Sequence, residues 1–190
     1  MQSVVNDIFF SVYQYFGFGL VFAIVSMLAL PEMKRLGIKS SLQQVWHCIR
    51  SSAEYKYRFF FFLYLFMVLS RTLICRNMWQ CPWENIIGEW GIFTSEGTFN
   101  TEGLLNIFLF FPLVYFGLRG FNQRDKSNKW IVVNVIKASF SFSCMIEICQ
   151  LFLRLGTFQL SDIFQNTLGG FIGVTIYIIR QKMKGREKLR

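Results

Sequence analysis

The stretch from Trp130 to Leu153, WIVVNVIKASFSFSCMIEICQLFL, decides the class of this fold. A membrane-crossing helix needs about 20 predominantly apolar residues, and this stretch supplies them. One carboxylate interrupts it, Glu147, and Gln150 follows on the same face of a helix. A carboxylate in an apolar span is costly unless it has a partner or a task. The stretch therefore predicts a membrane-crossing helix whose polar stripe has either a partner or a task.

The composition places the whole chain in the same class. Of its 190 residues, 53% are hydrophobic, 23 are phenylalanine and 16% are charged, whereas soluble domains are about 25% charged. We therefore expect an integral membrane protein that forms a single domain over residues 1–190. A net charge of +9 would favour nucleic acid as the partner of a soluble chain. Here the distribution of charge among the loops explains it, and no nucleic-acid partner is expected.

Further apolar segments flank the opening stretch. Together they predict five membrane spans, at Ile8–Leu30, Phe59–Cys75, Leu104–Leu118, Trp130–Leu153 and Ile163–Ile179. The third is the shortest and contains Pro112, where we expect a kink.

The loops between these segments alternate in charge. Most of the 20 lysines and arginines lie between spans one and two, between spans three and four, or after span five. The loop at 76–103 carries Arg76 against four glutamates. Cytoplasmic loops are rich in lysine and arginine. The sequence therefore predicts an all-α bundle of about five transmembrane helices, with the N-terminus outside and the C-terminus in the cytoplasm.

A shorter amphipathic helix is expected in the first basic loop. Apolar residues recur at helical spacing from Leu42 to Ile49, and Ser40 with Gln43 resembles a capping box. Such a helix would lie on the inner surface of the membrane.

The cysteines and the histidine do not form a metal-binding motif. His47 and Cys48 are adjacent, but no Cys-x-x-Cys pair or mixed Cys/His set accompanies them. We therefore expect neither a metal nor a cofactor. Cys75 and Cys81 fall on the same side of the membrane, and a disulfide between them and two free thiols both remain open.

The predicted orientation brings polar residues from four spans to the outer half of the membrane. They are Arg71, Asn106, Ser143, Glu147, Gln150, Arg154, Asp162 and Asn166. Arg71 with Glu147, and Arg154 with Asp162, are the expected ion pairs. The amides would satisfy the remaining donors and acceptors, because an unpaired polar group in hydrocarbon costs several kcal/mol.

Small residues follow this polar set in the last span. Gly169 and Gly173 form a G-x-x-x-G pattern, with Gly170 beside it. Such patterns let a membrane helix approach a neighbour closely. We expect this face to pack against another helix of the same chain.

The same residues carry a resemblance to a known family. The segment SCMIEICQLFLRLGTFQLSDIFQNTLGGFIG, Ser143 to Gly173, resembles the VanZ-like family, and so do Asn106–Leu113 and Arg71-Thr72-Leu73. The family-like core covers about residues 59–180, followed by a basic cytoplasmic tail at 181–190. The chain departs from the family pattern at Val114, where glycine is common, and at 159–162, where many members carry an acidic run.

The resemblance implies a multi-pass protein of the bacterial cytoplasmic membrane that is linked to resistance to glycopeptide antibiotics, especially teicoplanin. It implies no particular reaction.

Three interpretations of the polar set stay open. The polar set binds an amphiphile, such as a lipid-linked cell-wall precursor or a lipoglycopeptide, beside membrane lipid. Alternatively, it is the site of an intramembrane enzyme with Glu147 as general acid or base and Asp162 as an orienting or metal-binding group. As a third possibility, it only holds the helices in register. The oligomeric state is left open.

Overall fold

The structure is a computed structural model that describes residues 2–32, 38–74, 83, 85–91, 97, 100–123 and 125–187. Side chains are described from residue 14 to residue 184, except at 38, 39 and the gaps. Cys75 and Cys81, with their expected pairing, lie outside the described residues.

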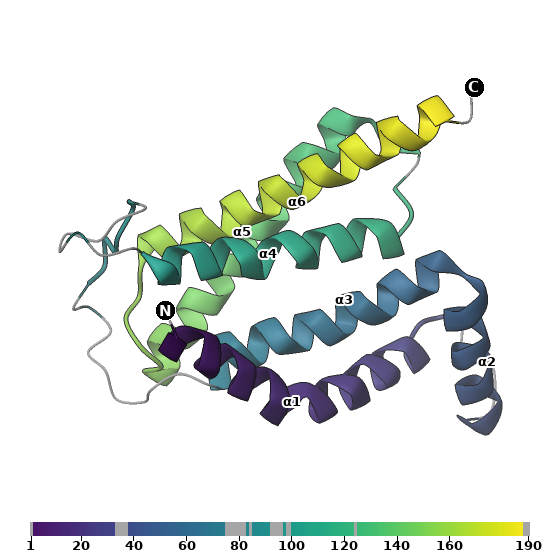
Figure 1. The fold of residues 1–190 in the computed structure, drawn as a ribbon, viewed down its shortest axis with the longest axis horizontal. Helices are drawn as coiled ribbons and strands as arrows, with labels where there is room; N and C mark the ends of the chain where they lie inside the picture. The colour runs from purple at the N-terminus through teal and green to yellow at the C-terminus, as the bar shows by residue number, and fades with distance from the viewer. Residues whose placement is uncertain are drawn as a thin grey trace.

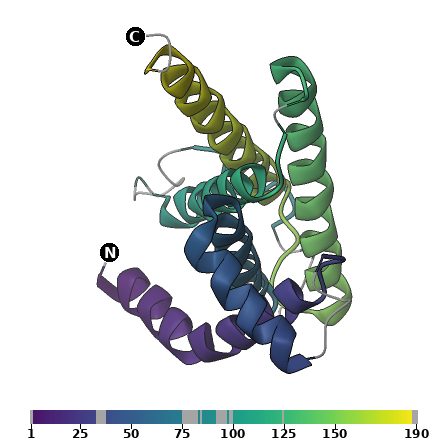
Figure 2. The same ribbon diagram turned by 90° about the vertical axis from the view of Figure 1, so that its right-hand side faces the viewer.

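All regular secondary structure of the described residues is helical (Figure 1). Its elements are α1 (Gln2–Leu28), α2 (Ile38–Ser51), α3 (Ala53–Leu69), the π-helix η1 (Ser70–Ile74), α4 (Thr101–Gly120), α5 (Asn128–Leu153) and α6 (Leu160–Glu187). The helices α3, α4 and α6 run roughly along one axis, and α5 crosses them obliquely (Figure 1). Figures 1 and 2 show α1 and α3 on one side of α4, and α6 on the other side with α5 packed against it.

Four helical stretches of the described chain are long and apolar enough to cross a membrane. They are Ala53–Ile74, Thr101–Gly120, Asn128–Leu153 and Leu160–Lys184. The described side chains of α1 add a shorter apolar helix, Gln14–Leu28. The expected all-helical membrane bundle is confirmed. The membrane crossing by α1, which is the predicted span Ile8–Leu30, stays a prediction, and so does the total of five spans.

The third span is longer than its apolar residues indicated. We expected Leu104–Leu118, whereas α4 runs from Thr101 to Gly120. Asn100 explains the earlier start, because its Oδ1 accepts a hydrogen bond from the Gly103 amide at 2.9 Å and caps the helix. Pro112 lies inside α4, and the expected kink there stays a prediction.

Glycines set the closest helix contact of the bundle, between α4 and α6. A Cβ atom at Gly169 would lie 2.4 Å from the Ile107 carbonyl oxygen, and one at Gly173 would lie 2.6 Å from the Phe111 carbonyl oxygen. Both distances are far below van der Waals contact with backbone that cannot easily move. The G-x-x-x-G face of α6 therefore lies directly on the backbone of α4 within one chain.

The amphipathic helix α2 turns across the ends of α1 and α3 (Figure 1). It begins at Ile38, so the expected capping role of Ser40 is wrong, because Ser40 lies inside the first turn. Val45 is buried against Met27 of α1, whereas Leu42 and Trp46 remain exposed. The apolar face of α2 is thus only partly covered by the protein.

An ion pair joins the turn that follows α1 to α3, near α2. Arg58 Nη1 lies 2.9 Å from Glu32 Oε2, and the Tyr55 hydroxyl donates to the same oxygen. The hydrogen bond from Tyr55, together with the Arg58 charge, lowers the pKa of Glu32 below its usual value.

Candidate functional site: a buried polar cluster at one end of the bundle

Four polar side chains form a buried stripe along α5. Ser139, Ser143, Glu147 and Gln150 recur at spacings of three and four residues, which places them on one helical face. All four are buried, and Glu147 is only 1% exposed. The stripe faces α6 and η1, as its hydrogen bonds show. We call these residues and the groups that contact them the polar cluster.

The chain that follows α5 folds back over Glu147. Arg154 caps α5 in the left-handed conformation (φ 53°), and the Leu155 amide donates to the Gln150 carbonyl oxygen at 2.9 Å. Leu155 and Gly156 are buried. The Gln159 amide then donates to Glu147 Oε2 at 3.0 Å. The connection between α5 and α6 is therefore a cover held by the carboxylate itself.

The polar cluster reaches the second span through Gln150. Its Nε2 donates to the Thr72 carbonyl oxygen at 2.8 Å and joins α5 to η1. Thr72 lies in η1, and π-turns change the register of backbone hydrogen bonding relative to an α-helix. The π-helix thus provides the carbonyl that the Gln150 amide needs.

Two further bonds connect α6 to its neighbours. Asn166 Nδ2 donates to Ser143 Oγ at 2.8 Å, which joins α6 to α5. Asn106 Nδ2 donates to Gln165 Oε1 at 3.3 Å, which joins α4 to α6. Asn106, expected here from the sequence, therefore meets Gln165, which sequence reasoning missed.

A loop covers this end of α6. The Gln165 Nε2 group donates to the Glu89 carbonyl oxygen at 3.0 Å, and the Leu160 amide donates to the Ile86 carbonyl oxygen at 2.9 Å. Gly88 (φ 69°) permits this contact, because a Cβ atom there would lie 1.9 Å from Ser161 Oγ. The ring of Trp90 packs on Phe164 at 5.3 Å between centroids.

The charged residues expected in the cluster take different positions. Asp162 is buried in the first turn of α6. Arg71 is half-buried in η1, and Arg154 is exposed after α5. The expected pairing of Arg71 with Glu147, and of Arg154 with Asp162, stays a prediction.

Several polar groups at this end of the bundle were missed, for different reasons. Gln165 had a usable signal, because it follows Asp162 by three residues and shares its helical face. Asn100 had one too, since asparagine is a favoured cap before a helix. The carbonyl of Thr72 and the amide of Gln159 had none, because any residue supplies those backbone groups.

The cluster holds polar atoms without hydrogen-bond partners. In the described part of the chain they include Ser139 Oγ, Gln150 Oε1, Asn166 Oδ1 and Ser70 Oγ, all buried. Buried polar groups are normally satisfied, so each such atom needs an explanation, such as a missing ligand or water. No group of three or more His, Cys, Asp or Glu side chains able to hold a metal occurs among the described residues. The unpartnered atoms of the cluster can therefore form additional hydrogen bonds.

Membrane-length helices and a polar cluster buried at one end define a multi-pass membrane protein. The sequence model of the VanZ/LLP1 family matches residues 18–181, and the chain belongs to this family.

One curated relative is Protein VanZ of Enterococcus faecium, 31% identical over 100 residues. The matched residues cover 51% of this chain and 56% of the relative, so the similarity spans only about half of that protein. No solved structure matches the chain.

Proposed function

We propose that this protein lowers the susceptibility of a bacterium to glycopeptide antibiotics of the teicoplanin type, by binding an amphiphile at the polar cluster. The ligand is a lipid-linked cell-wall precursor or the lipoglycopeptide itself. Family membership and the resemblance to Protein VanZ support the phenotype. The unpartnered buried atoms of the cluster carry the proposal for binding.

The proposed orientation puts the cluster in the outer leaflet of the bacterial cytoplasmic membrane. The chain crosses five times, with its N-terminus outside, because the basic connections then lie in the cytoplasm. The loop that covers α6 and the connection between α5 and α6 then face outward, where both proposed ligands occur.

Binding requires the cover over Glu147 to move. The Gln159 amide leaves Glu147, and hydroxyl or amide donors of the ligand take its place. Gln150 Oε1 and Asn166 Oδ1 accept further hydrogen bonds, which relieves the cost of leaving them unpaired. Arg71 and Arg154 contact phosphate or carboxylate groups of the ligand.

The first test is Glu147→Gln, measured as the minimum inhibitory concentration of teicoplanin in cells with matched expression. Glutamine keeps an oxygen that accepts the Gln159 amide, so we expect the fold to be preserved while the carboxyl group is lost. We expect the protection to disappear. Glu102→Gln is the matched control, because Glu102 is exposed in the first turn of α4. Full protection by a well-expressed Glu147→Gln protein would reject the functional role of the cluster.

The second candidate is an intramembrane enzyme that acts on a lipid-linked envelope substrate. The observation that favours it is the burial of two carboxylates, Glu147 and Asp162, at the same end of the bundle. Glu147 would act as general acid or base. An intact-lipid mass profile of cells with and without the protein separates the two candidates, because only an enzyme changes the lipids chemically.

A further inference from the structure

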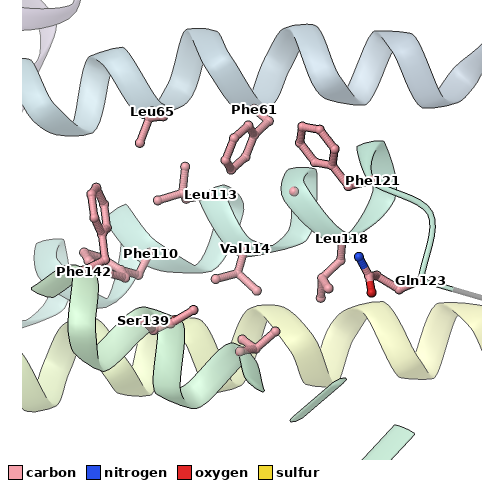
Figure 3. A pocket seen from close by; sticks show the side chains of 13 residues that line it. Phe61, Leu65, Phe110, Leu113, Val114, Leu118, Phe121, Gln123, Ser139 and Phe142 are labelled. Atoms are coloured by element: carbon pink, nitrogen blue, oxygen red, sulfur yellow. The ribbon is translucent and has the colours of Figure 1, made fainter. Parts of the chain in front are cut away.

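A groove that shares Ser139 with the polar cluster, but not Glu147 or Gln150, lies between α3, α4 and α5 (Figure 3). Its volume is about 450 Å³, which falls within the range of about 300–1,000 Å³ for small-molecule sites. Phe61 and Leu65 of α3 reach toward α4 from one side, and Phe142 of α5 lies on the other side. The lining is apolar except for Ser139 and Gln123.

The groove is open to the surface rather than enclosed. The three helices that form it are each long and apolar enough to cross a membrane. Its mouth therefore faces hydrocarbon and not water. An apolar surface at this depth is filled by lipid chains, because the few polar atoms of the lining offer water too few partners.

The two ends of the groove differ. At one end Phe110 and Phe142 pack together, with ring centroids 5.7 Å apart. At the other end Gln123 lies just after α4 (Figure 3). There the guanidinium carbon of Arg58 lies 5.4 Å from the centroid of the Phe121 ring.

This second end has the residues of a membrane interface. Lys126 is three residues beyond Gln123, and its ammonium group lies 5.2 Å from the centroid of the exposed Trp130 ring. Tryptophan and basic side chains are enriched at headgroup level. The groove therefore runs from the headgroup level of one leaflet toward the middle of the membrane.

We propose that the groove binds one acyl chain of a membrane phospholipid, with the headgroup beside Gln123 and Lys126. This lipid belongs to the leaflet of the basic connections, opposite the polar cluster. It serves as a structural lipid between α3 and α5, which contact each other little, since α3 packs on α4 and α5 packs mainly on α6. The proposal does not depend on the function of Glu147.

The test uses protein reconstituted in vesicles of phosphatidylglycerol and phosphatidylethanolamine, then released in mild detergent and analysed by native mass spectrometry. Wild type is expected to retain one phospholipid per chain. Ala138→Phe fills the mouth of the groove from an exposed position and should lose that lipid. Val135→Phe, which fills the groove from a deeper position, is a second variant in case the first does not fold. Val133→Phe is the matched control, since Val133 is exposed and does not line the groove.

A phospholipid with a photoactivatable diazirine on its acyl chain locates the site directly. Cross-links are expected on groove residues such as Leu113, Leu118 and Phe142. The proposal is overturned if wild type retains no lipid, if folded Ala138→Phe retains as much as wild type, or if cross-links fall only on outward residues such as Val133 and Phe140. Glu147→Gln should retain the lipid, so this result and the antibiotic test fail or succeed separately.

Discussion

Glu147 is tolerated in an apolar helix because its own chain returns to it. The carboxylate accepts the Gln159 amide, and its neighbours on α5 bond to η1 and α6. Burying a charge without such bonds costs far more than a single hydrogen bond returns. The burial of Glu147 thus depends on the path of the connection after α5. The same residue lies in the proposed binding site.

Asn166→Ala tests the bond between α5 and α6. The change leaves Ser143 Oγ without its donor in a fully buried position. We expect a loss of about 1–3 kcal/mol in stability. The measurement is the thermal unfolding midpoint in detergent. Asn134→Ala is the control, because Asn134 is exposed on α5 and donates to the Trp130 carbonyl oxygen in its own helix. Equal shifts for the two variants would contradict a special role for Asn166.

Glu32 predicts a pH dependence at the other end of the molecule. Its pKa is lowered in the folded state from the usual 4.5. The stabilisation that the Glu32 carboxylate contributes is therefore complete above about pH 4.5. It is lost as the pH falls through the lower pKa that Glu32 has in the folded state. The effect is small, since the Glu32 side chain is 52% exposed and solvent screens the pair.

The check compares wild type with Glu32→Gln across this pH range. The difference between their unfolding midpoints should be greatest near neutral pH and should shrink in acid. A difference that grows as the pH falls would have the wrong sign.

At the scale of elements, α6 organises the bundle. One face carries Asn166 toward α5, and the glycines beside it lie on the backbone of α4. Polar bonding and close packing thus occur on adjoining faces of one helix. Without water in the membrane, close packing and interhelical hydrogen bonds are what hold helices together.

Gly169→Ala should separate α4 from α6. The new Cβ atom would lie 2.4 Å from the Ile107 carbonyl oxygen, and backbone cannot yield as a side chain can. We expect destabilisation of about 1–3 kcal/mol, measured by thermal unfolding in detergent. Gly17→Ala in α1 is the matched control, because nothing lies within 4 Å of its added methyl group. A neutral Gly169→Ala would show that the two helices are further apart than described.

Across the whole molecule, basic connections gather at one end and the polar cluster at the other. Lys126 follows α4, and the basic side chains Lys182 and Lys184 close α6 at the same end (Figure 1). Glu102 opens α4 at the opposite end. The proposed orientation places the first set in the cytoplasm.

Single-cysteine variants in a background without native cysteines test this orientation in intact cells. A maleimide that does not cross membranes should label Glu102→Cys directly. It should label Lys126→Cys only after the cells are made permeable. The reverse labelling pattern would show that the protein has the opposite orientation, with the polar cluster in the inner leaflet.

The sequence determined the class, the approximate spans and most of the polar cluster. Apolar length requires helices in a membrane, and helical spacing places Ser143, Glu147 and Gln150 on one face. These are local properties, so they can be predicted from residues close together in the chain.

Only the tertiary structure decided what these residues contact. Three features depend on how distant segments pack. They are the Gln159 amide on Glu147, the Thr72 carbonyl oxygen that accepts from Gln150, and the groove beside α4. Backbone groups are present at almost every residue and carry no sequence signal. A groove is a space between helices, so its position follows from their packing and not from the identity of any one residue.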